Sequence, residues 1–141
     1  MFLGEYQHSL DAKGRVILPA RFRDQLEGGA VMARALDGCL AVYPVSEFDR
    51  VAAKLREARE RGARERQAAR SFFTGAVEIT PDKQGRVAIP AHLREYASLE
   101  REVIVAGNFD HLEIWDHETF NQRDREGTAS IVEGEGINDF V

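Results

Sequence analysis

Short apolar segments separated by turn residues fill most of the chain, which is the pattern of short β-strands. Four segments in the first 43 residues predict strands: 7–10, 15–18, 30–36 and 39–43. Pro19 lies between the second and third and predicts a helical segment over 20–26, because proline at a first helical position loses no hydrogen bond. Gly28-Gly29 ends that segment, and Asp37-Gly38 predicts a hairpin turn. The predicted order is β-β-α-β-β.

The same pattern occurs twice, at an offset of 71 residues. Asp11-Ala-Lys-Gly-Arg-Val-Ile-Leu-Pro-Ala20 aligns with Asp82-Lys-Gln-Gly-Arg-Val-Ala-Ile-Pro-Ala91, with identity at Asp, Gly, Arg, Val, Pro and Ala. Further along, residues 40–43 align with 112–115 at an offset of 72. The second copy predicts a helix over 90–96 and strands over 102–106 and 112–115. Because four short strands bury little apolar surface alone, we expect both copies to share one core.

A helix is predicted between the copies. Ser46 is its expected N-cap, with an acid three residues on, and apolar residues follow at helical spacing. Residues 54–70 then hold seven basic and three acidic side chains. This surface could meet phosphate. The alternative, which we favour, is a solvated helix stabilised by Glu–Arg pairs one turn apart.

The C-terminal segment is predicted to be a shorter helix from Asp116 followed by an acidic, flexible tail. The expected division of the chain is therefore a first repeat over 5–47, a connecting basic helix over 48–70, a second repeat over 76–119 and a tail over 126–141.

Charge and composition narrow the function. The net charge is −5, but residues 1–70 hold 13 basic and 10 acidic side chains whereas residues 71–141 hold 6 and 14. A local anion-binding face on an acidic protein is therefore possible.

The single cysteine, Cys39, excludes an internal disulfide and is expected to be a buried, inert thiol. The four histidines form no ligand pair at zinc-site spacing, and no glycine loop opens a helix, so we expect neither an enzyme nor a cofactor. No apolar run approaches the roughly 18 residues of a membrane span, and the expected location is the cytoplasm.

The duplicated motif resembles the MraZ family of bacterial transcriptional regulators, which contain two SpoVT-AbrB-type domains. The residues that carry the resemblance are Leu10-Asp-Ala-Lys-Gly-Arg15, Leu18-Pro-Ala-Arg-Phe-Arg23, Phe72-Phe-Thr-Gly75, Asp82-Lys-Gln-Gly-Arg86, Ile89-Pro-Ala-His-Leu-Arg-Glu-Tyr-Ala97 and Glu113-Ile-Trp115. The likeness spans about residues 1–125 and leaves out the tail.

This resemblance implies an α+β, mainly β fold: a pseudo-symmetric, AbrB-like swapped-hairpin β-barrel with peripheral helices. It also implies a ring-shaped homo-oligomer such as an octamer. For function, it implies binding of double-stranded DNA at tandem promoter repeats of the division and cell-wall gene cluster, with a location at the nucleoid.

Arg15 and Arg86 would lie on the DNA-facing surface, as the resemblance implies, with Lys13 and Lys83 in the same loops. The chemistry agrees, because arginine presents a planar fork that binds guanine or phosphate through two hydrogen bonds. A β-hairpin loop is also narrow enough to enter a major groove. Gln84 stands where the first copy has Lys13, so the second loop is expected to contribute less charge there.

The remaining motif residues have expected structural roles. Gly14 and Gly85 let the backbone turn and approach closely. Asp11 and Asp82 are expected to cap the turn or to orient the arginine, because a carboxylate facing DNA would be repelled. Three arginines lie on the predicted short helices: Arg21, Arg23 and Arg94. Two alternatives remain equally open for them, contact with DNA phosphates and simple exposure to solvent.

A second class of function uses the same scaffold: an antitoxin-like module that binds a partner protein through its tail. That class predicts one motif copy per chain, a dimer, and apolar anchors in the tail. The chain instead has two copies and an acidic tail, whose apolar residues are Ile131, Val132, Ile137, Phe140 and Val141. The sequence therefore favours a DNA-binding regulator.

Overall fold

The computed structural model describes residues 1–139 and contains the two predicted repeats in the predicted order. The elements of the first are β1 (Glu5–Ser9), β2 (Arg15–Ile17), α1 (Ala20–Arg23), η1 (Asp24–Leu26), β3 (Ala30–Arg34), η2 (Leu36–Gly38) and β4 (Leu40–Pro44). Those of the second are β5 (Val77–Ile79), β6 (Arg86–Ala88), α4 (Ala91–Tyr96), β7 (Glu102–Gly107) and β8 (Leu112–Asp116). The predicted hairpin forms around Asp37-Gly38, which have φ of 65° and 80°. The Ala35 amide donates to the Cys39 carbonyl, so the loop holds three residues, 36–38.

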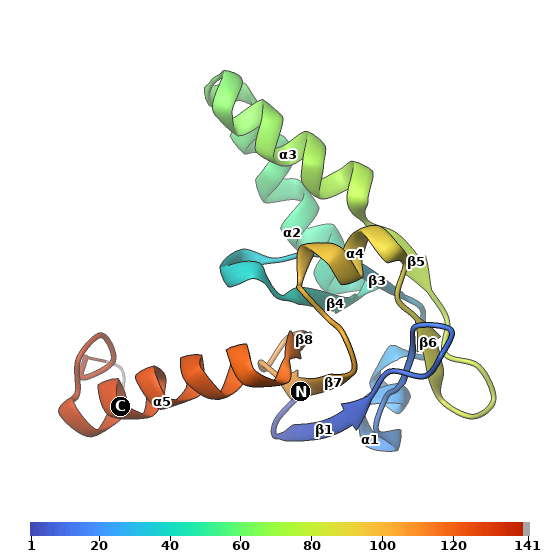
Figure 1. Cartoon of the computed structure of the whole chain (residues 1–141). Helices are drawn as coiled ribbons and strands as arrows, with labels where there is room; N and C mark the ends of the chain where they lie inside the picture. Colours follow the sequence, from blue (N-terminus) through green and yellow to red (C-terminus); the bar gives the residue numbers. More distant parts are fainter. Residues whose placement is uncertain (140–141) are drawn as a thin grey trace.

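The strands form a six-stranded antiparallel sheet, in the order β1-β7-β8-β4-β3-β5, and a separate two-stranded ribbon of β2 and β6 (Figure 1). The repeats exchange strands: β1 of the first pairs with β7 of the second, and β5 of the second pairs with β3 of the first. The fold is therefore α+β, with an antiparallel sheet and peripheral helices; more residues lie in helices than in strands, so the expectation of a mainly β fold is wrong. Over residues 1–139, no strand pairing joins the two edges, β1 and β5, into a closed barrel.

Both repeats feed one hydrophobic core, as expected. Equivalent positions are buried together: Leu18 with Ile89 and Phe22 with Leu93 are each at most 1% exposed and belong to the same cluster. Val16 and Val87 join them from the paired strands β2 and β6. The core therefore holds the ribbon against the sheet from one side.

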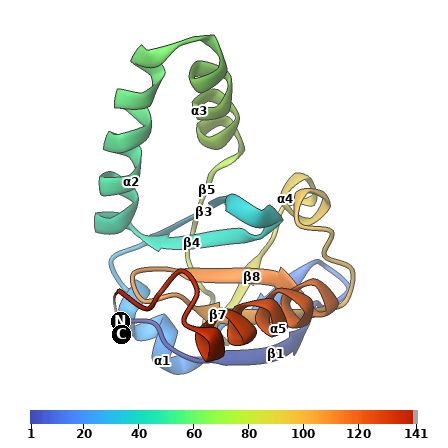
Figure 2. The same cartoon turned by 90° about the vertical axis from the view of Figure 1, so that its left-hand side faces the viewer.

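The connection between the repeats is a helical hairpin, so the prediction of one continuous helix over 48–70 is wrong. It consists of α2 (Val45–Ala58), η3 (Arg59–Arg61) and α3 (Ala63–Gly75), and the chain reverses at Gly62. Figure 2 shows α2 and α3 side by side, projecting from the sheet. The reversal lets Phe48 of α2 stack on Phe72 of α3, with ring centroids 6.0 Å apart. The predicted N-cap is also wrong, because Pro44 occupies that position and no side chain caps the helix.

The C-terminal helix, α5 (His117–Glu133), is longer than predicted, so residues 126–133 are helical where a flexible tail was expected. Asp116 caps it by accepting a hydrogen bond from the Thr119 backbone at 3.1 Å. It ends at Gly134 in the left-handed conformation, where the amides of Gly134 and Glu135 return to carbonyls of the last turn. The predicted tail residues Phe140 and Val141 lie outside the described residues. No helix within residues 1–139 is long and apolar enough to cross a membrane.

Candidate nucleic-acid interface

The ribbon of β2 and β6 brings the two predicted arginines onto one surface. The strands are antiparallel, and Val16 lies opposite Val87 at the centre of the register. Both valines are buried, at 1% and 2% exposure, so the alternating neighbours face away from the core. These outward positions form the surface that we call the ribbon face: Arg15, Ile17, Arg86 and Ala88. Each arginine lies directly across from the apolar residue of the other repeat.

The loop before β2 holds Arg15 by a network centred on Asp11. One carboxylate oxygen of Asp11 accepts hydrogen bonds from the backbone amides of Lys13 and Arg15, each at 2.9 Å. The other oxygen accepts from Nε of Arg15 at 2.7 Å. The Arg15 side chain is 28% exposed. Asp11 therefore closes the turn and orients the guanidinium, which are the two roles expected for it.

The second loop repeats this geometry. Asp82 accepts from the amides of Gln84 and Arg86 at 2.9 Å each and from Nε of Arg86 at 2.8 Å. In both loops, the hydrogen bond from the arginine amide contributes most to lowering the pKa of the aspartate, and the guanidinium bond adds to it. Both carboxylates are therefore charged at neutral pH, and each forms a charge-assisted bond to its arginine.

Each loop is also covered by an arginine of the other repeat. Gly14 has φ of +74°, and a Cβ there would overlap the guanidinium of Arg94, whose Nη1 donates to the carbonyl of Ile89. Gly85 has φ of +82°, and a Cβ there would overlap Arg23. The two glycines are thus required both for the turn and for this contact. The sequence left open whether Arg23 and Arg94 contact phosphate or only solvent. In the structure both are half-buried and pack against the ribbon loops.

The loop lysines are exposed. Lys13 lies in the first loop, and Lys83 lies one position earlier in the second loop, beside Gln84. Each loop therefore carries one lysine, and the lower charge at Gln84 is matched by Lys83. The exposed Ile17 was predicted only as a strand residue. Strict alternation about the buried Val16 is the sequence signal that could have placed it beside the arginines.

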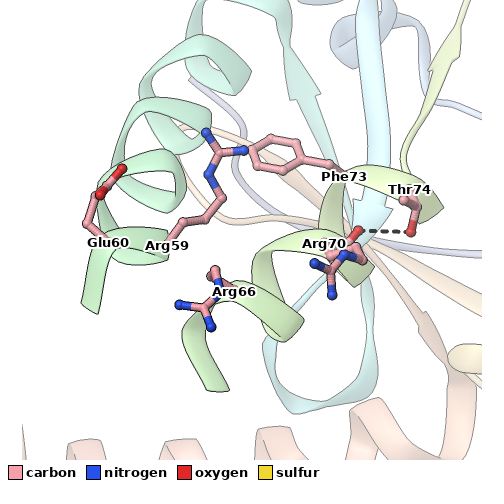
Figure 3. Close-up of a pocket in the computed structure, with 6 residues that line it drawn as sticks. All are labelled: Arg59, Glu60, Arg66, Arg70, Phe73 and Thr74. Atoms are coloured by element: carbon pink, nitrogen blue, oxygen red, sulfur yellow. Dashed lines mark hydrogen bonds between the residues drawn. The ribbon is translucent and has the colours of Figure 1, made fainter. Parts of the chain in front are cut away.

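A second basic surface lies on the helical hairpin. Arg59, Arg66 and Arg70 line a groove of about 590 Å³ together with Glu60, Phe73 and Thr74. Figure 3 shows these residues around the groove, where the Thr74 hydroxyl donates to the carbonyl of Arg70 at 2.8 Å. Among the described residues, no side chain from 54 to 70 makes an ion pair, so the predicted Glu–Arg pairs are absent.

Two further side chains, Cys39 and His111, are not part of the ribbon. Cys39 is 1% exposed, so its expected burial is confirmed, and burial raises its pKa to about 12, which favours the less reactive thiol form. His111 lies between two carboxylates: its Nε2 is 3.3 Å from Glu113 and its Nδ1 is 2.7 Å from Asp110. The bond to Glu113, and then that to Asp110, raise the pKa of His111 despite its partial burial. Asp110 also lies 3.5 Å from Arg50 of α2, so this cluster joins the base of the hairpin to the β7–β8 loop.

Comparisons with known proteins agree with the internal repeat. The protein-family model described as MraZ protein, antitoxin-like, matches twice, over residues 1–71 and 72–134. A protein of Heliobacterium modesticaldum named transcriptional regulator MraZ is 44% identical over 141 residues, covering 99% of both chains. Proteins of the same name from Salinispora arenicola and Desulforamulus reducens are 45% and 42% identical, with 95% and 100% of this chain covered and 96% and 100% of theirs. By the two-fold match and by these relatives, the chain belongs to the MraZ family.

Proposed function

We propose that the protein is a transcriptional regulator, not an enzyme, that binds double-stranded DNA sequence-specifically through the ribbon face. One observation carries this proposal: two arginines, each held by an aspartate in the same geometry, lie on the outward side of one two-stranded ribbon. The names of the relatives support the regulatory role.

The ribbon is suited to reading bases because its arginines are positioned before DNA arrives. Asp11 and Asp82 bind the Nε atoms, and within residues 1–139 the Nη groups of Arg15 and Arg86 have no protein partner. A guanidinium edge of this kind can donate two hydrogen bonds to O6 and N7 of guanine. Two-stranded ribbons fit the major groove, and the exposed Lys13 and Lys83 supply charge for the neighbouring phosphates.

The finer architecture is also a proposal. We infer a swapped-hairpin barrel of the AbrB kind, in which the two repeats wrap one core; the exchange of β1 and β5 between repeats and the shared core support it. Copies of the chain would form a closed ring such as an octamer, acting at the nucleoid in the cytoplasm.

A ring would present several ribbon faces to several DNA repeats. After the first contact, the others become intramolecular, and affinity can rise about 10²–10⁴-fold without new contacts. Such binding requires tandem repeats that face one side of the duplex, which means spacing near one helical turn, about 10 base pairs, or its multiples. Promoter repeats of the division and cell-wall gene cluster are the targets that this family suggests.

Footprinting of the purified protein on the DNA upstream of its own gene tests the function. We expect protection of short, regularly spaced repeats. In gel shifts, deletion of one repeat should weaken binding, and insertion of about five base pairs between repeats should weaken it further, because about half a turn separates the faces. Uniform, sequence-independent protection would contradict the proposal. Equal affinity for one repeat, phased repeats and the insertion would contradict the multivalent ring.

The matching family model is described as antitoxin-like, which supports one alternative function, that of a module that binds a partner protein. In that case the chain would bind a small partner protein in a fixed ratio. Pull-down with the tagged chain distinguishes the two: a stoichiometric partner, retained by Arg15→Ala and lost on removal of α5, would favour the alternative.

A further inference from the structure

We propose that Ile17 reads the C5-methyl group of a thymine next to the base that Arg86 contacts. This inference rests on the proposed function, because it assigns a specificity role within the ribbon face. It starts from an exposed apolar side chain: Ile17 is 46% exposed, although it lies in a strand.

The position of Ile17 is fixed by the ribbon register. It lies directly opposite Arg86 and two residues from Arg15 on the same side of β2. Side chains directly opposite on antiparallel strands have Cβ atoms about 4.5–5.5 Å apart. Stacked bases of one strand are about 3.4 Å apart. A base read by Arg86 therefore has its neighbour within reach of Ile17.

The chemistry of the position selects the ligand. Both arginines on the ribbon face are aligned for polar base edges, and Ile17 can offer only apolar contact. In the major groove, the methyl group of thymine is the one apolar feature that distinguishes a base pair, and apolar side chains contact it. Binding would remove both surfaces from water, which favours a thymine over a cytosine at that place.

The two repeats differ at this position. Ala88 lies opposite Arg15 where Ile17 lies opposite Arg86, so each arginine has an apolar neighbour from the other repeat, one large and one small. Alanine reaches less far from the strand. We therefore expect one half of each site to depend strongly on a thymine methyl and the other half to depend on it weakly.

Deoxyuridine provides the probe, because it pairs as thymine does and lacks only the methyl group. Each thymine of one footprinted repeat is replaced in turn, and the dissociation constant is measured by fluorescence anisotropy at fixed salt. For the unmodified protein we expect one replacement to weaken binding about 3–5-fold, as expected for one buried methyl group. Ile17→Ala should bind the thymine repeat with about the same loss, and should bind the two DNAs equally.

Two further variants sharpen the test. Leu36→Ala removes an apolar side chain that is 88% exposed and lies in the turn between β3 and β4, so it should keep the full sensitivity to deoxyuridine. Ala88→Ile should create sensitivity at a second thymine. Circular dichroism and light scattering must show that each variant keeps the fold and assembly of the parent.

The outcomes separate this inference from the function on which it rests. Failure of the unmodified protein to bind any repeat would overturn the proposed function. Specific binding with no effect of deoxyuridine at any position would overturn the role of Ile17 alone. Full sensitivity retained in Ile17→Ala would also overturn it. A changed assembly state in Ile17→Ala would show that the residue contacts a second copy and would overturn the inference as well.

Discussion

The molecule has two basic surfaces, the ribbon face and the groove of the helical hairpin, and they are built differently. Each ribbon arginine is bonded to an aspartate that also closes its loop. The hairpin carries more basic residues, yet Arg59, Arg66 and Arg70 are exposed and form no ion pair within the described chain, although Arg70 donates a hydrogen bond to Gln67. The ribbon is anchored in the core by Val16 and Val87, whereas α2 buries none of its residues and α3 buries only Ala69 and Gly75.

This contrast teaches that the number of charges does not identify an interface. An arginine held in one geometry loses little conformational freedom when it binds a base, so more of its interaction energy appears as affinity. A free arginine on a solvated helix loses that freedom on binding. The ribbon, with fewer charges, is therefore the better candidate for specific recognition.

The largest effect is expected from the ribbon arginines. Arg15→Ala and Arg86→Ala should each weaken binding to a single repeat by about 1–3 kcal/mol if the arginine contacts a base. The melting temperature should change little, because partly exposed ion pairs such as those of Arg15 and Arg86 contribute only about 0–1 kcal/mol. Gel shifts and thermal melts measure both. Normal binding by both variants, or unfolding of both, would contradict the assignment.

A smaller effect, on stability, is expected at the turn. Gly14→Ala should destabilise the fold by about 1–2 kcal/mol, because the position has positive φ and the new Cβ overlaps Arg94. Denaturant unfolding measures it. Arg94→Ala loses the bond to Ile89 on its own, so it is the reference for the double variant Gly14→Ala/Arg94→Ala. Against that reference, adding Gly14→Ala should cost less than it does in the parent, because the overlap is gone and only the strained φ remains. Gly28→Ala is a control, because its Cβ would meet nothing within 4 Å. Equal stability of Gly14→Ala and Gly28→Ala would show that the ribbon loop is less tightly packed than the structure indicates.

The base of the hairpin should respond to pH. The folded-state pKa of His111 is raised, so its contribution to stability is full below the unfolded value near 6.5 and is lost as pH rises through the folded value. The His111 side chain is 19% exposed and its pairs with the carboxylates are partly screened by solvent, so we expect only about 0.5 kcal/mol. Unfolding measured at pH 5.5 and 8.5 should show this difference in the parent and not in His111→Gln, while operator binding by the variant stays unchanged at pH 7. An identical pH dependence of both proteins would exclude the cluster as its source.

The smallest effect is expected from the hairpin groove. The triple variant Arg59→Gln/Arg66→Gln/Arg70→Gln should change the affinity for one repeat by less than about twofold, since these side chains are not pre-positioned. Its salt dependence should match that of the parent. If the steepness of the plot of log affinity against log salt concentration instead falls by about 0.9 for each arginine removed, the groove contacts phosphates. That result would reverse the comparison between the ribbon face and the groove.

The sequence predicted the parts of the fold that local patterns encode. The repeat, the order of its elements, the Asp37-Gly38 turn and the loops around Asp11 and Asp82 follow from turn chemistry and alternation. The exchange of β1 and β5 was not predictable from such patterns, because it pairs strands far apart in the chain. The ends of the helices were also ambiguous in the sequence, because a glycine can end a helix, reverse the chain or lie within a helix. Gly62 reverses the chain, Gly127 lies within α5, and only Gly134 makes the capping bonds that end the helix.

The pairing of β2 with β6 has a consequence for how the protein is made. Arg15 leaves the ribosome long before Arg86, and β2 has no partner until β6 has been synthesised. Pairing such distant segments costs the entropy of closing a long loop. A chain that stops within the helical hairpin would carry the first arginine loop without its opposite strand. The ribbon is thus completed only in molecules that contain both repeats, so prematurely terminated chains would lack the surface proposed to bind DNA.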